Sequence, residues 1–145
     1  PISNAGNADA ATGKIKLEPP SSGTILRIVE FPPDTAWRGS ADAKKAFASI
    51  GAGGAPDHAS SDAMMHATAT VDYIIVLKGE IWAILDKGEK LLKQGDVLIQ
   101  RGTNHSWSVR TREPAIVAAV LVGARPAGRL TRRKSKATAK RGKKR

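Results

Sequence analysis

Residues 71–107 read VDYIIVLKGEIWAILDKGEKLLKQGDVLIQRGTNHSW. Short runs rich in Val, Ile and Leu alternate here with turn-forming pairs such as Lys78-Gly79 and Gln94-Gly95. Runs of this length and composition, bounded by glycine turns, predict β-strands. No strand–helix alternation follows, and the sequence contains neither a GxGxxG nor a phosphate-binding loop. We therefore expect an all-β fold without a nucleotide cofactor.

The same pattern continues on both sides of this stretch. The strands expected between Met64 and Val122 are Met64–Thr70, Tyr73–Lys78, Glu80–Leu85, Lys90–Leu92, Asp96–Gln100, Ser106–Arg110 and Ala115–Val122. Another strand is predicted over Thr24–Phe31, where Pro32-Pro33 ends an alternating run. A short helix is predicted over Ala41–Ile50. Strands that recur at a spacing of about ten residues are typical of a β-sandwich or barrel.

The positive charge of the chain is concentrated at its C-terminal end. The 145 residues include 24 Lys and Arg against 13 Asp and Glu, which gives a net charge of +11. Eleven of the basic residues lie within 125–145, where no acidic residue occurs, and residues 1–124 are therefore neutral overall. We expect 125–145 to be a disordered tail that contacts polyanions non-specifically. The alternative is a tail that only increases solubility.

Composition also bounds the organisation and the location of the protein. We divide the chain into an irregular N-terminal arm over 1–23, a barrel over 24–124 and the tail. No cysteine is present, which excludes disulfides and thiol nucleophiles. No apolar run approaches the roughly 20 residues of a membrane helix, and no secretory signal is recognisable, so we expect a cytoplasmic protein. The first residue is Pro1, which indicates a processed chain or a missing upstream segment.

The first of two motifs lies at His66, Thr68, Asp72 and Gly79. Its spacing resembles that of the first cupin motif, in which HxH is followed by a glutamate and then by a glycine. Thr68 stands in the place of the second histidine, and Asp72 in the place of the glutamate. This resemblance is to the small single-domain cupins of the type-2 conserved-barrel group, with an incomplete metal motif.

The second motif begins at Gly95-Asp96 and reaches His105. It is similar to the second cupin motif, although Gln100 stands where proline is usual and Val109 where asparagine is usual. The motif core spans 66–122. The resemblance implies a jelly-roll barrel whose motif residues line the interior.

The resemblance also implies a candidate site inside the barrel. A divalent metal, Fe or Zn, would be bound by His66, Asp72 and His105, a set of two histidines and one carboxylate. His105 is also the candidate catalytic acid or base. Because alternate residues of a strand share a face, His105 and Trp107 are expected to point the same way, and Tyr73 away from Asp72. The residues expected to contact a ligand are Trp107, Thr68 and Arg101, the last through a substrate carboxylate.

Three functions remain open at this level. The first is a small-molecule-binding cupin that acts as a metal-dependent oxygenase, decarboxylase or isomerase on a small organic acid. The second is a metal-free cupin that binds or senses a ligand. The third is a nucleic-acid-associated protein that acts through its basic tail. We also predict a homodimer, because Ile15, Leu17 and the strand Thr24–Phe31 carry apolar residues without an evident partner.

Overall fold

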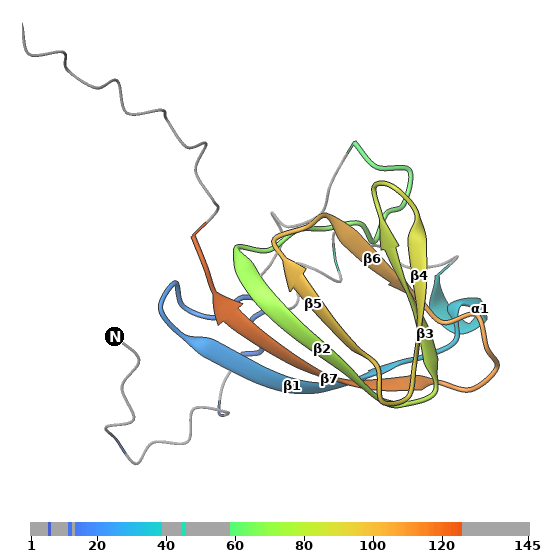
Figure 1. Cartoon of the computed structure of the whole chain (residues 1–145), viewed down its shortest axis with the longest axis horizontal. Coiled ribbons are helices and arrows are strands. Elements are labelled where there is room, and N and C mark those ends of the chain that lie inside the picture. The colour runs from blue at the N-terminus through green and yellow to red at the C-terminus, as the bar shows by residue number, and fades with distance from the viewer. Residues whose placement is uncertain (1–5, 7–11, 13, 39–44, 46–58, 126–145) are drawn as a thin grey trace, which may run out of the picture.

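Two antiparallel β-sheets face each other across an apolar core (Figure 1). The computed structural model describes residues 6, 12, 14–38, 45 and 59–125. The larger sheet has the strand order β1-β7-β2-β5 and consists of Thr24–Phe31 (β1), Ala115–Gly123 (β7), Thr70–Lys78 (β2) and Val97–Arg101 (β5). The smaller sheet has the order β4-β3-β6 and consists of Glu89–Lys93 (β4), Glu80–Leu85 (β3) and His105–Ser108 (β6). The predicted all-β jelly-roll barrel is confirmed.

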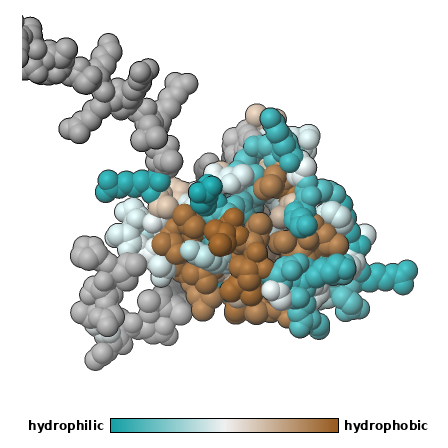
Figure 2. Space-filling view, in the orientation of Figure 1, coloured by the Kyte–Doolittle hydropathy of each residue, from teal (hydrophilic) through white to brown (hydrophobic). Residues whose placement is uncertain are grey.

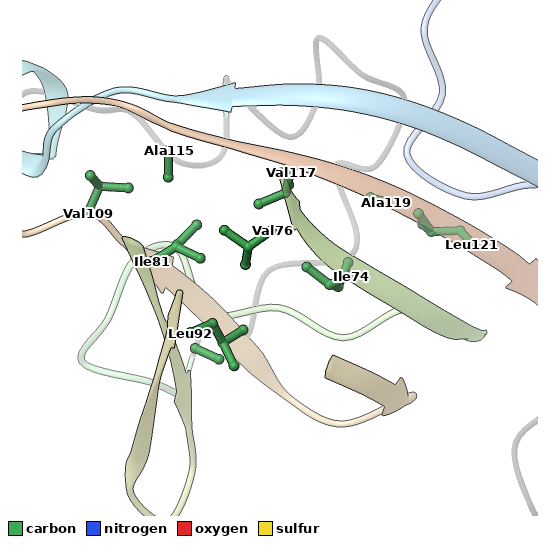
Figure 3. Packing of buried hydrophobic residues seen from close by; sticks show 10 residues of the cluster. Ile74, Val76, Ile81, Leu92, Val109, Ala115, Val117, Ala119 and Leu121 are labelled. Atoms are coloured by element: carbon green, nitrogen blue, oxygen red, sulfur yellow. The ribbon is translucent and has the colours of Figure 1, made fainter. Parts of the chain in front are cut away.

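The core forms because burial alternates along the strands of both sheets. On β2 the buried positions are Thr70, Asp72, Ile74 and Val76, and the residues between them face outward. Figure 3 shows that the buried aliphatic side chains come from the two sheets and meet between them. The residues of this cluster are Ile74, Val76, Ile81, Ala83, Leu92, Val109, Ala115, Val117, Ala119 and Leu121. Polar Asp72 therefore shares its face with residues that form a hydrophobic core.

The tight connection between β2 and β3 depends on Gly79. Its φ of 78° lies in the left-handed region, which side chains other than glycine rarely adopt. A Cβ atom at this position would also lie 2.9 Å from the carbonyl oxygen of Pro114. Both conformation and space therefore require the glycine that ends the first motif.

The strand expected over Met64–Thr70 is wrong in its extent. Only His66 pairs there, through an isolated bridge to His105, and β2 begins at Thr70. The reason is local, because the Asp62 side chain accepts a hydrogen bond from the Met64 backbone N–H at 3.0 Å and the Asp62 carbonyl accepts one from Met65 at 3.0 Å. These bonds hold the backbone in a turn instead of an extended strand.

The N-terminal part of the barrel contains a strand and one helical turn. The predicted strand over Thr24–Phe31 is β1, and its partner is β7 of the same chain. Helix α1 (Asp34–Trp37) follows Pro32-Pro33 and was not predicted from the sequence. Within the described residues no helix has the length and apolarity that crossing a membrane requires. The predicted helix over 41–50 lies outside the described residues except at Lys45, as does the tail beyond Arg125.

The outer face of the larger sheet is unusually apolar. Figure 2 shows hydrophobic side chains gathered over this part of the surface. The exposed large hydrophobic residues of this sheet lie on β1, β2 and β5, and they are Leu26, Ile28, Tyr73, Leu77, Val97 and Ile99. We call these six residues the outer apolar face.

Candidate functional site

A large cavity opens between β1 and the interior of the barrel. Its volume is about 1540 Å³. The polar residues of its inner wall are His66, Thr68, Asp72 and His105, and its apolar wall includes Ile74, Trp107, Val117, Ala119 and Leu121. A concave, mostly apolar space with a few convergent polar groups is typical of a small-molecule site. Four residues of the sequence-predicted site therefore lie around one cavity together with Trp107.

His66 and His105 form the centre of this polar cluster. Their backbones are joined by two reciprocal hydrogen bonds of 2.8 Å, and their ring centroids lie 4.2 Å apart. Both side chains are buried, with exposed fractions of 8% and 4%. The isolated bridge, rather than a regular strand, thus places the two imidazoles side by side.

Hydrogen bonds fix the tautomer of each imidazole. Nδ1 of His66 lies 2.9 Å from the Met64 carbonyl, and Nδ1 of His105 lies 2.9 Å from the Thr103 carbonyl. Because a carbonyl oxygen can only accept, each Nδ1 must carry the proton. In the neutral ring, Nε2 then keeps the lone pair that accepts a proton, a hydrogen bond or a metal ion.

Burial keeps both histidines neutral near pH 7. It lowers the pKa of His105 to about 4, and the neighbouring His66 contributes in the same direction. Burial also lowers the pKa of His66, although the Met64 carbonyl and the carboxylates of Asp72 and Asp62 oppose the effect. The pair therefore presents neutral imidazoles to the cavity, and not a concentrated positive charge.

Asp72 is the one acidic side chain buried in the cavity wall. Its exposed fraction is 4%, and its Oδ1 has no hydrogen-bond partner among the described residues. Burial raises the pKa of Asp72, while hydrogen bonds from Thr70 and Thr68 and the nearby His66 act in the opposite direction. The Thr68 and Thr70 hydroxyls also lie 2.7 Å from each other. Asp72 therefore retains its proton to a higher pH than an ordinary carboxyl group.

Trp107 forms the aromatic side of the site. Its ring meets that of His105 edge-on, with centroids 5.6 Å apart and an angle of 76° between the planes. Phe31 of β1 lies behind it at 6.2 Å. The prediction that His105 and Trp107 share a face is confirmed, as is the outward direction of Tyr73 relative to Asp72.

Ion pairs and hydrogen bonds hold β6, the strand that carries His105 and Trp107. Arg38 donates to the Trp107 carbonyl at 2.6 Å and to the Asp62 carboxylate at 2.5 Å. Ser106, which lies between His105 and Trp107 on β6, donates a short hydrogen bond to the same carboxylate. These contacts hold the pKa of Asp62 below its usual value. These contacts were not predicted from the sequence, because Arg38 and Asp62 are far from β6 along the chain.

Arg101 does not line the cavity. It lies at the end of β5, where it is exposed and pairs with Val71 on the outward-facing row of the sheet. The motif suggested a turn before His105, but β5 continues through Arg101, so alternation turns Gln100 inward instead. The position of Arg101 therefore does not support the predicted contact with a substrate carboxylate.

The donor set fits a metal ion only in part. His66 and His105 present the tautomer that metal-binding histidines adopt, and Asp72 lines the same cavity. Among the residues that the structure describes, however, no group of three His, Asp or Glu side chains lies close enough to hold a metal ion. The three-ligand set His66, Asp72 and His105 stays a prediction, and we derive no chemical step through a metal.

Comparison with known proteins gives relatives along part of the chain. No protein-family model matches. The "Cupin-domain-containing oxidoreductase srdD" of Neurospora crassa is 32% identical over 111 residues, which are 74% of this chain and 43% of that protein. The "Phomopsin biosynthesis cluster protein C'" of Diaporthe leptostromiformis is 53% identical over 51 residues, or 34% of this chain and 27% of that protein. The chain thus spans less than half the length of these relatives.

A cupin-2 domain containing protein from Shewanella frigidimarina aligns with a TM-score of 0.42 and 12% sequence identity, and the alignment covers 67% of this chain and 68% of that one.

Proposed function

We propose that this chain, which is a cupin, binds a small organic molecule in the cavity beside β1 and exchanges a proton with it through His105. The observation that carries the proposal is the buried pair of neutral imidazoles, each with Nδ1 bonded to a carbonyl and Nε2 left as the acceptor. Apolar walls of Ile74 and Trp107 would bind the body of the ligand. The hydroxyl or acidic C–H group of the ligand would lie against the imidazoles.

The ionisation of the site suits proton transfer between neutral groups. Burial raises the pKa of Asp72 and lowers that of His105, which favours a protonated carboxyl group together with a neutral imidazole. His105 Nε2 would accept a proton from the ligand and Asp72 would donate one to it, and a proton transfer from His105 to Asp72 would then restore both groups. This favours an isomerisation of a small organic acid, in which one proton leaves and one arrives without a change in oxidation state.

A redox reaction on the same ligand is the second candidate. This candidate is supported by two relatives, from Neurospora crassa and Hypocrea virens, which are named cupin-domain-containing oxidoreductases. An Fe ion would supply electron transfer to such a reaction and a Zn ion only Lewis acidity, with His66 and His105 as two of the ligands. The identity of the reaction stays a proposal, because the chain covers only 43% of each of those proteins.

Tryptophan fluorescence can test ligand binding at this site. Trp107 contacts His105, whereas Trp82 lies beneath the guanidinium of Arg110, 4.4 Å from it. Trp37 also lines the cavity, so Trp107 is followed in a Trp37→Phe background. We expect a panel of small aromatic and branched acids to contain ligands that change the emission of Trp37→Phe and of Trp37→Phe/Trp82→Phe, and that have no such effect in Trp37→Phe/Trp107→Phe. His105→Asn should weaken their binding. If no acid in the panel binds by calorimetry, the proposed function is wrong.

The proton-transfer step has its own readout. In D₂O, an acid that carries an exchangeable C–H group beside its carbonyl should lose that proton faster with the parent protein than with His105→Asn, as followed by NMR. Equal rates of C–H exchange with the two proteins would contradict the isomerase role and would support ligand binding alone.

A further inference from the structure

Arg27 faces the cavity from the inner side of β1. The burial of this strand alternates, and Ile25, Arg27, Val29 and Phe31 occupy its less exposed side. Val29 and Phe31 pack against the hydrophobic core, which shows that this side faces inward. Arg27 is therefore a cationic residue on an otherwise apolar strand face, and it contributes to the cavity wall.

The register of the sheet places free space beside Arg27. It pairs with Ala119 of β7, and Ala119 pairs in turn with Ile74 of β2. The three residues form one row across the inner face, and Ala119 contributes only a methyl group between two long side chains. Two strand spacings separate Arg27 from Ile74, a distance of roughly 10 Å. A small ligand can thus lie over Ala119 with one end at the guanidinium.

Arg27 lacks the anionic partner that Arg38 and Arg110 possess. Arg38 pairs with Asp62 at 2.5 Å, and Arg110 pairs with Glu89 at 2.5 Å. Among the described residues, Arg27 takes part in no ion pair and no hydrogen bond. Half-buried charges without a partner are unfavourable, because desolvation is not compensated. Burial accordingly lowers the pKa of Arg27.

The remaining polar groups of the cavity do not supply the missing charge. Asp72 lies two strands away from β1, and burial raises its pKa, which favours its neutral form. The exposed charged residues of the cavity rim are Lys14, Lys16, Glu18 and Glu30, and their charges cancel. The rim therefore adds no net charge to that of Arg27.

We propose that Arg27 binds the carboxylate of the ligand, and that the cavity takes monocarboxylic acids whose apolar body lies over Ala119 and Ile74. The inference rests on the proposed function in that it names the ligand class of the same cavity. The planar guanidinium binds a carboxylate through two parallel hydrogen bonds, which fixes the orientation of the ligand as well as its charge. The far end of the acid is then directed toward the histidine pair.

Matched acids and amides test this assignment. The probes are 3-phenylpropanoate, 4-methylpentanoate and their neutral amides, titrated calorimetrically into the full chain. We expect the parent to prefer the acids over the amides by at least tenfold, and Arg27→Gln to abolish that preference by weakening only the acids. Arg27→Lys should recover part of it, since charge remains but the two-pronged geometry is lost. Arg101→Gln is the control, because Arg101 is exposed on the outer side of the same sheet.

The outcomes separate this inference from the proposed function. If the parent binds acids and amides equally and Arg27→Gln changes neither, the cavity binds ligands but Arg27 does not select them. If neither acids nor amides bind, the ligand-binding function fails and the inference fails with it. A melting temperature of Arg27→Gln equal to or above that of the parent is also expected, because the variant removes an unpaired charge. A large decrease would assign Arg27 a structural role and overturn the proposal.

Discussion

Asp72 on β2 and Gln100 on β5 are directly paired across the larger sheet, and each keeps one buried side-chain oxygen without a hydrogen-bond partner among the described residues. The Gln100 amide donates to the Thr103 carbonyl at 3.0 Å, so its oxygen needs a donor from elsewhere. Burial raises the pKa of Asp72, which favours its neutral carboxyl group.

Asp72→Asn should stabilise the fold above neutral pH. A group whose pKa is raised by folding contributes stability below its unfolded pKa and loses that contribution as the pH rises through the folded pKa. The asparagine amide is neutral at every pH and avoids the buried carboxylate charge, so we expect a gain of about 1 kcal/mol at pH 8 in urea unfolding. Glu113→Gln, an exposed site, is the control for loss of charge alone. A less stable Asp72→Asn variant at pH 8 would contradict this account.

Stability should fall as the pH decreases from about 6.5 to about 4, because of His105. Its folded pKa of about 4 lies below the unfolded value of 6.5, so in this window the unfolded chain binds a proton that the folded chain does not. The shift corresponds to a loss of about 3 kcal/mol, and His66 acts in the same direction. Denaturant unfolding of the parent and of His105→Gln measures the difference. An equal decrease in both proteins would assign the effect to other groups.

The sequence predicts the strands of the barrel well, because their apolar runs and glycine turns are local signals. It also predicts His66, His105 and Trp107 in one place, because motif spacing and strand alternation determine their face. It fails at Met64–Thr70, where the bonds of Asp62 replace the expected strand by a turn. Contacts with side chains that are distant in sequence produce no such local signal.

Arg27 and Arg101 show the same limit at the scale of one residue. The register of strand pairing determines which residues of a strand face inward, and a shift of the register by one residue exchanges the two faces. The strand β5 includes Arg101, which turns this residue outward. On β1, by contrast, Arg27 occurs at the spacing of Ile25 and Val29, and it was not predicted from the sequence as a site residue. The assignment of that face to the cavity required the pairing with β7.

Arg38→Ala should destabilise the barrel and loosen the site together. Arg38 joins α1 to the Asp62 turn and to the Trp107 backbone, with both partners of the ion pair largely shielded from solvent. We expect a loss of about 2 kcal/mol, since a partly buried charge and a carbonyl lose their partner. Lys93→Ala breaks the exposed pair with Glu80 and should cost less than about 1 kcal/mol. Equal effects of the two variants in thermal unfolding would remove the special role of Arg38.

Thr68→His tests whether the cavity is one ligand short of a metal site. Thr68 is buried in the wall that also contains His66 and His105, and an imidazole there would supply a third nitrogen ligand. We expect Zn²⁺ to bind at least about tenfold more tightly than in the parent. Thr103→His, at an exposed position, controls for the mere addition of a histidine. If titration calorimetry detects no tighter binding in Thr68→His, the metal prediction for this cavity is wrong.

We propose that a second copy of the chain covers the outer apolar face. Leu26 and Ile28 are exposed by 66% and 62%, and Ile99 of the opposite edge strand by 56%. The width of the face is four strands at a spacing of about 4.8 Å, and its length is about eight residues at a rise of about 3.3 Å per residue. Its projected area is therefore roughly 500 Å². Each partner of a stable interface buries roughly 800 Å², so the outer apolar face would form the centre of a somewhat larger contact.

The charges of this sheet support a copy of itself as the partner. The charged residues on the outward side lie at its rim, and they are Glu30, Lys78 and Arg101. An apolar face with a mixed rim can pack against itself about a two-fold axis without repulsion between like charges at the centre. We therefore expect light scattering to give the mass of a dimer at micromolar concentration.

One substitution on each sheet separates this dimer from unspecific association. Ile99→Lys places a charge on the β5 side of the outer apolar face and should give a monomer with unchanged unfolding behaviour. Lys90→Glu, exposed on β4 of the smaller sheet, should leave the mass unchanged. A parent protein that scatters as a monomer at these concentrations would show that the face is not a self-association surface. A dimer that persists in Ile99→Lys would place the interface elsewhere on the molecule.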